Sequence, residues 1–198
     1  MQSGAAAVGR FYGGDFRHLA KLLGLFRHAK SDWGDGAQRD FDRGLNERGV
    51  KGAAVMGDHI RAHGTQWDRL IGSPAIRVVD TLKGALPEMP AIYDERLYLA
   101  SSDTILEVAQ AHAGEGEDEA HSILVSGHNP GMQEVVLDLV SPSHENDLFR
   151  EAVVKFPTAT FAVLECNIES WSQLKPRCAK LIHFARPRDI DPDLGPGA

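Results

Sequence analysis

The chain has 198 residues, a formal net charge of −7 and a composition that is 42% hydrophobic and 25% charged. A chain of this length can bury one proper core, but it is too short for two domains of ordinary size. No apolar run approaches the ~20 residues needed to cross a bilayer, and the negative charge argues against a nucleic-acid partner, which normally requires a basic face. We therefore expect one globular domain with no membrane and no nucleic-acid partner.

The two ends of the chain differ in composition from the rest. Residues 1–21 are rich in glycine and alanine and lack the continuous apolar region of a secretory signal. We expect a flexible extension there, with an organelle transit peptide as the alternative. The segment 187–198 has three prolines, two glycines and three aspartates, which predicts a flexible tail. The single domain is expected to span 22–186.

Apolar runs bounded by turn residues predict strands, and periodic apolar patterns between them predict helices. The expected strands are 22–26, 69–72, 123–126, 160–165 and 180–185. The expected helices are 46–63 with Asn46 as N-cap, a helix opened by Pro74, then 104–113 and 130–140. The last two strands are joined by a connection too short for a comfortable crossover helix, so we expect an antiparallel hairpin. The order predicts an α/β fold, a three-layer α/β/α sandwich with a mostly parallel mixed sheet.

The chain has two cysteines, Cys166 and Cys178, and neither belongs to a metal-type spacing. Two reduced thiols are the expectation for a cytoplasmic protein. A disulfide between adjacent C-terminal strands is the alternative. We expect no metal and no other cofactor.

Three polar clusters follow apolar runs or open helices. They are Arg27-His28-Ala29-Lys30-Ser31, Ser73-Pro74-Ala75-Ile76-Arg77 and Gly127-His128-Asn129-Pro130. Open α/β sheets bind their ligands at the carboxyl ends of the strands. A guanidinium matches phosphate oxygens, and an imidazole can attack phosphorus. The clusters therefore predict a phosphoryl-handling site.

Each candidate residue has a plainer alternative. His28 is the candidate nucleophile, and a polar histidine without chemistry at a strand end is the equal alternative. Ser73 contacts ligand or, more in keeping with its position, caps the following helix. Arg77 is placed one turn into that helix, from which its side chain can return to the strand end.

In this order, the clusters resemble the histidine phosphatase superfamily, in its branch of small bacterial phosphohistidine phosphatases. The resemblance covers 22–140 and implies a phosphoglycerate mutase-like fold, with Arg27, His28, Arg77 and His128 as catalytic residues. The segment containing Asp40, Arg43, Leu45, Arg48 and Gly49 also resembles this branch. We accordingly expect Lys30, Ser31, Arg43, Ser73 and Asn129 to contact substrate, although Arg43 is equally compatible with a surface position.

Two positions depart from the larger, mutase-type relatives. Gly34 stands where they often have asparagine, and Leu99 stands where they carry the carboxylate that acts as general acid. Proton donation is worth typically 10²–10⁴-fold for a poor leaving group and less for a good one, such as imidazole. The loss of the acid therefore favours N–P bonds over esters, unless Glu95 or Asp103 substitutes.

The connections 83–122 and 141–160 are too short for a separate cap domain, so the expected site is open to a phosphorylated protein. The expected activity is a two-step phosphoryl transfer through phospho-His28. The expected substrate is phosphohistidine of a protein. Alternatives are a phosphatase of small phosphorylated substrates, a mutase-like phosphotransferase and, in another class, a non-catalytic phosphate- or protein-binding module.

Overall fold

The computed structural model describes residues 20–195. Six strands form one mixed sheet in the order β3-β2-β4-β1-β5-β6. The strands are β1 (Lys21–Arg27), β2 (Arg69–Gly72), β3 (Ile92–Tyr93), β4 (Ser122–Gly127), β5 (Phe161–Cys166) and β6 (Ala179–Ala185). Strand β1 pairs in parallel with β4 and antiparallel with β5, and β5 and β6 form the expected antiparallel pair. The predicted α/β sandwich with a mixed sheet is confirmed.

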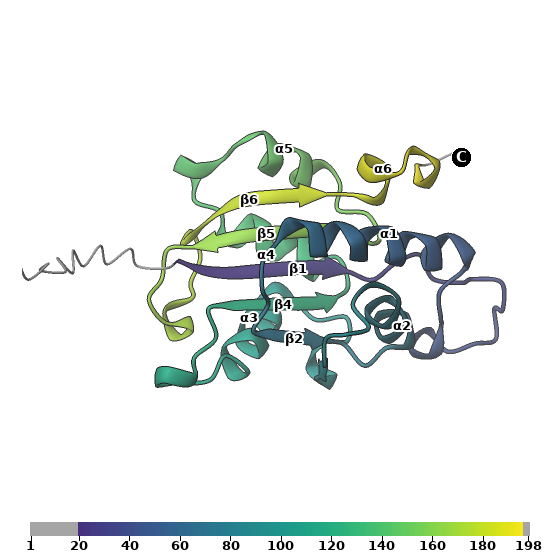
Figure 1. The fold of residues 1–198 in the computed structure, drawn as a ribbon, viewed down its shortest axis with the longest axis horizontal. Coiled ribbons are helices and arrows are strands. Elements are labelled where there is room, and N and C mark those ends of the chain that lie inside the picture. The colour runs from purple at the N-terminus through teal and green to yellow at the C-terminus, as the bar shows by residue number, and fades with distance from the viewer. Residues whose placement is uncertain (1–19, 196–198) are drawn as a thin grey trace, which may run out of the picture.

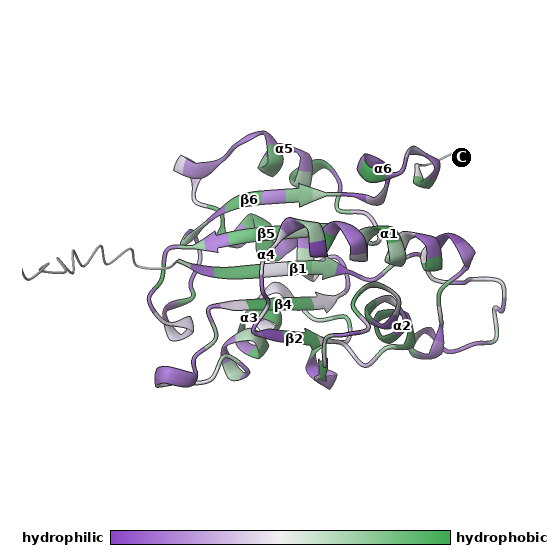
Figure 2. Cartoon of the chain, in the orientation of Figure 1, coloured by the Kyte–Doolittle hydropathy of each residue, from purple (hydrophilic) through white to green (hydrophobic). Residues whose placement is uncertain are grey.

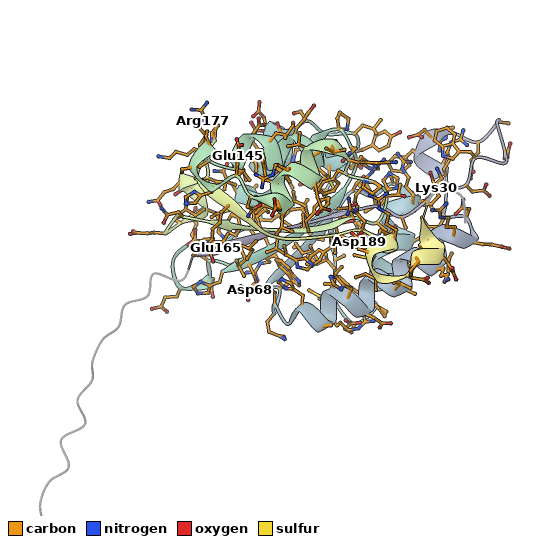
Figure 3. The ribbon with its side chains drawn as sticks, turned by 90° about the horizontal axis from the view of Figure 1, so that it is seen from above. Lys30, Asp68, Glu145, Glu165, Arg177 and Asp189 are labelled. Atoms are coloured by element: carbon orange, nitrogen blue, oxygen red, sulfur yellow. The ribbon has the colours of Figure 1, made fainter. Side chains whose placement is uncertain are left out.

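Helices cover both faces of the sheet, as Figure 3 shows edge-on. They are α1 (Glu47–His63), α2 (Ile76–Ala85), α3 (Ser102–Ala111), α4 (Gly131–Leu139), α5 (Asp147–Val154) and α6 (Pro187–Ile190). The N-cap of α1 is Asn46, whose side chain accepts a hydrogen bond from the Gly49 amide, as predicted. Within 20–195 no helix is long and apolar enough to cross a membrane.

The alternation of side chains along β1 divides the core into two clusters. Leu23 and Leu25 pack with α3, α4 and α5, whereas Phe26 packs with α1 and α2 on the other face. Figure 2 shows the resulting hydrophobic centre of the sheet. The carboxyl ends of β1, β2 and β4 lie together at one end of the molecule, on the right in Figure 1.

Two expectations on the ends of the domain need correction. The segment 187–195 is not a loose tail: it forms α6 and a 3-10 turn, and Leu194 is buried. Lys51 of α1 forms an ion pair with Asp191 at 2.7 Å, which links this segment to α1. The predicted N-terminal extension lies outside the described residues, except that Lys21 already belongs to β1. Strand β3 and helix α5 were not predicted, because each is shorter than a periodic pattern can reveal.

The two cysteines are free thiols. Cys166 is buried, and Cys178 is half-buried beside it. A hydrogen bond with Cys166 lowers the pKa of Cys178 to about 6.

Candidate active site

The carboxyl ends of β1, β2 and β4 surround a cavity of about 370 Å³, which we call the catalytic cavity. Arg27 ends β1 and His28 follows it, Arg77 lies in the first turn of α2, and His128 follows β4. Thus three segments far apart in the sequence bring the four predicted catalytic side chains to one place. The cavity is lined by Arg27, His28, Lys30, Ser31, Trp33, Asp40, Arg77, Leu99, His128, Asn129 and Thr158.

His28 is held with one ring nitrogen free. Its Nδ1 lies 2.7 Å from the carbonyl oxygen of Ala29. A carbonyl can only accept, so Nδ1 carries the proton and Nε2 keeps its lone pair. Burial lowers the pKa of His28 to about 3; the bond to Ala29 opposes this, and the charges of His128, Arg27 and Arg77 add to it. The imidazole is therefore neutral at pH 7 and available as a nucleophile.

His128 faces His28, with ring centroids 5.2 Å apart. Its Nε2 lies 2.9 Å from the Ser73 hydroxyl, while its buried Nδ1 has no hydrogen-bond partner in the described structure. Burial, followed by the charge of Arg77, lowers the pKa of His128 to about 4. A buried polar atom without a partner is costly, so His128 leaves one polar atom of the site unsatisfied.

Arg77 is fixed by a residue that the sequence analysis did not count as part of the site. Its Nη1 donates to the Asp40 carbonyl at 2.6 Å, and its Nη2 donates to the Asp40 carboxylate at 2.9 Å. Tyr98 donates its hydroxyl proton to the same carboxylate at 2.8 Å. Burial opposes ionisation of Asp40, but the bonds from Tyr98 and Arg77 outweigh it and lower the pKa of the carboxyl. Asp40 is thus a fixed anion that orients the guanidinium.

Arg27 is held by a backbone group from the other side of the cavity. Its Nη1 donates to the Phe156 carbonyl at 2.7 Å, and its buried Nε has no partner. Burial and the charge of Arg77 lower its pKa to about 10, so the guanidinium stays protonated at neutral pH. Two neighbouring arginines repel one another, and an anion bound between them relieves this repulsion.

The loop after β1 is anchored to two helices. The Thr81 hydroxyl of α2 accepts from the Ala29 amide at 2.9 Å and donates to the Arg77 carbonyl at 2.5 Å. At the start of α1, a Cβ on Gly49 would lie only 2.1 Å from the Lys30 carbonyl oxygen. Glycine is therefore needed for α1 to approach the loop so closely.

The other predicted site residues divide into two groups. Lys30, Ser31 and Asn129 line the catalytic cavity. Arg43 and Ser73 do not. Arg43 is buried under Trp33, 4.3 Å from its ring, and donates to the carbonyls of the 32–42 loop.

Ser73 is not the N-cap of α2, which is Ala75. Its hydroxyl contacts Nε2 of His128 at 2.9 Å and accepts a longer hydrogen bond from the Ala75 amide, at 3.3 Å, just before the helix begins. The two predicted substitute acids, Glu95 and Asp103, are exposed and are not among the residues that line the cavity.

Comparison with known proteins places this arrangement in a family. Residues 23–98 match the histidine phosphatase superfamily (branch 1). An uncharacterised protein of Mycobacterium leprae is 34% identical over 166 residues, which cover 82% of this chain and 99% of the relative. The chain belongs to the histidine phosphatase superfamily.

Solved histidine phosphatases share the fold over most of the chain. A structure named as phosphohistidine phosphatase SixA from Nakamurella multipartitia is 30% identical, with a TM-score of 0.74 and coverage of 85% of this chain and 96% of that one. A second SixA structure, from Agrobacterium tumefaciens, is 29% identical, with a TM-score of 0.66 and coverage of 85% and 99%. The protein is therefore a phosphatase of the kind that uses a histidine nucleophile.

Proposed function

We propose that this histidine phosphatase removes the phosphoryl group from phosphohistidine of a protein, with His28 as its nucleophile. The proposal rests on the carboxylates of the catalytic cavity. Asp40 is the one acidic side chain among the lining residues, and it is committed to Arg77 and Tyr98. With its pKa lowered, Asp40 is a poor proton donor.

Leu99 occupies the position expected for the missing acid. It lines the catalytic cavity and is 57% exposed, with a backbone φ of 51°. An apolar side chain here gives no proton to a departing alkoxide. A phosphorylated imidazole needs less help, because it departs as a neutral ring when its second nitrogen carries a proton.

The reaction has two displacements. In the first, His28 Nε2 attacks phosphorus in line, a new N–P bond forms, and the N–P bond of the substrate breaks with its electron pair leaving on the substrate imidazole. In the second, water attacks the phosphoryl group on His28 and releases inorganic phosphate, which returns the His28 imidazole with its lone pair. Arg27, Arg77 and His128 bind the equatorial oxygens, where charge stabilisation contributes most.

An exposed rim supports a protein substrate. Trp33 is 63% exposed beside the cavity, and its indole nitrogen donates to Ser31 at 3.0 Å. Together with Leu99 it gives an apolar border to an otherwise cationic cavity. The same proposal includes a cytoplasmic location, where the protein would encounter phosphohistidine proteins and its own thiols would stay reduced.

The test compares release of phosphate from a phosphohistidine peptide and from the matching phosphoserine peptide, using the parent protein and Leu99→Glu. We expect the parent to prefer phosphohistidine. Leu99→Glu should raise the ester rate relative to the phosphohistidine rate by ~10-fold or more, because it supplies a proton donor. A parent that prefers the ester contradicts the substrate assignment, and a ratio unchanged in Leu99→Glu contradicts the role given to position 99.

A further inference from the structure

A second pocket adjoins the catalytic cavity, and nothing in the mechanism uses it. It has a volume of about 310 Å³ and shares Arg27, Lys30 and Thr158 with the cavity. We call it the basic pocket because its lining includes Arg27, Lys30, Arg48, Lys155, Arg186 and Arg188 and no carboxylate. This concentration of positive charge contrasts with the net charge of −7 of the whole chain.

Part of this charge is balanced by neighbouring carboxylates. Arg186 bonds to Glu151 at 2.5 Å and to Asp189 at 2.8 Å, and Arg188 lies 4.0 Å from Asp189. Arg186 is therefore structural.

The remaining cations have no carboxylate partner in the part of the chain that the structure describes. Within 20–195, Arg27, Lys30, Arg48 and Lys155 form no ion pair with a carboxylate. Several like charges gathered around one hollow raise its affinity for anions.

One wall of the pocket is formed by 187–195, the segment whose composition predicts a flexible tail. Arg48 of α1 donates to the carbonyls of Leu194 and Gly195, which fixes this segment as a wall of the pocket. Pro187 and Arg188 of α6 form another part of that wall. Figure 3 shows Lys30 and Asp189 of α6 at the same end of the molecule. The packing of α6 on α1 therefore creates a concave surface next to the catalytic cavity.

Arg27 connects the two hollows. Arg27 lines both of them, and the Phe156 carbonyl that holds its guanidinium precedes Pro157 and Thr158 of the basic pocket. A ligand that places one anionic group beside His28 can place a second on the far side of Arg27. The attraction of both groups to cationic side chains would then hold the ligand in one orientation.

We propose that the basic pocket binds a second anionic group, a phosphate or a carboxylate, of the same substrate whose phosphoryl group is attacked by His28. The proposal rests on the proposed function, because it takes the catalytic cavity as the site of the phosphoryl group. The second group has two sources, acidic residues beside the phosphohistidine of a protein or a second phosphate of a small molecule. The protein selects substrates that are anionic at two points.

The first experiment measures competitive inhibition by orthophosphate and by tripolyphosphate. One orthophosphate ion can occupy only one of the two hollows at a time, whereas tripolyphosphate carries several linked phosphates and can occupy both across Arg27. The test variant is the double substitution Lys155→Gln and Arg188→Gln, and the matched control is Lys83→Gln, an exposed lysine of α2 outside both hollows. We expect the preference for tripolyphosphate over orthophosphate to fall about fivefold in the double variant, because two exposed charge interactions with the ligand are lost. The preference should persist in the control.

The second experiment identifies the source of the anion. One arm compares phosphohistidine peptides with aspartates or serines on either side, and the other compares a sugar bisphosphate with the monophosphate. In the arm that reflects the natural substrate, the double variant should lose the advantage of the more anionic compound. Equal preferences in the parent and the double variant, for tripolyphosphate and in both arms, would overturn the proposal. Absence of turnover on every compound would instead overturn the proposed function.

Discussion

Two groups of histidines in this molecule have similar distances between their rings but different neighbours. His28 and His128 in the catalytic cavity have ring centroids 5.2 Å apart. His183 on β6 lies 5.1 Å from His59 and 4.7 Å from His63 of α1. Burial is the largest cause of a lowered pKa in each of the five.

The neighbours of the two groups decide what each can do. Arginines, hydroxyls and a fixed carboxylate surround the first pair, and the catalytic cavity opens beside it. In the second group, His59 and His63 pack edge-on against Phe161. The rings of His59 and His183 bond to each other, with 2.9 Å between their Nε2 atoms. Close histidines with lowered pKa values are therefore no sign of chemistry by themselves. Chemistry requires a free lone pair and a place for the substrate.

The largest expected effect separates the two groups directly. His28→Ala should lower kcat by ~10⁴-fold or more, because the displacement has no other nucleophile. His59→Ala should stay within about threefold of the parent, since its ring contacts His183 and Phe161, neither of which lines the catalytic cavity. Steady-state kinetics on a phosphohistidine peptide, with circular dichroism to confirm folding, makes the comparison. Substantial turnover in His28→Ala would contradict the assignment.

Asp40→Asn is expected to have the next largest effect. The substitution keeps the carbonyl bond to Arg77 but removes the negative charge that orients the guanidinium, so we expect kcat to fall ~10- to 100-fold. Asp42→Asn is the matched control, because Asp42 pairs with the exposed Arg39. A loss confined to KM, or an equal loss in the control, would show that Asp40 does not position Arg77 for the transition state.

The smallest expected effect concerns stability and pH in the second group. Burial, followed by the charges of His63 and His59, lowers the folded-state pKa of His183 to about 4, against an ordinary 6.5. Between these values the unfolded chain binds more protons, so the free energy of unfolding falls as the pH drops from about 6.5 to 4.

His183→Gln should reduce that fall by about 1 kcal/mol, measured by urea unfolding at pH 7 and pH 5. His144→Gln, at an exposed histidine, should leave the fall as it is in the parent. An equal fall in His183→Gln and in the parent would show that the second group does not contribute to the loss of stability at low pH.

The residues at strand ends could be predicted, and those that support them could not. Arg27, His28 and His128 each follow an apolar run that the pattern marks as a strand, and parallel strands end together. Asp40 and Phe156 reach the site from loops without periodicity, and only the folded chain brings them to Arg77 and Arg27. The same limit applies to 187–195, whose order depends on bonds from Arg48 and Lys51.

The central claim is that the phosphoryl group passes through His28. The most direct test is a rapid alkaline quench of the protein with a labelled phosphohistidine peptide, followed by peptide mapping. We expect one labelled peptide, which carries the label on His28. The variant His28→Ala should give no labelled peptide. A label on any other residue, or phosphate release during which no phosphorylated protein forms, would contradict it.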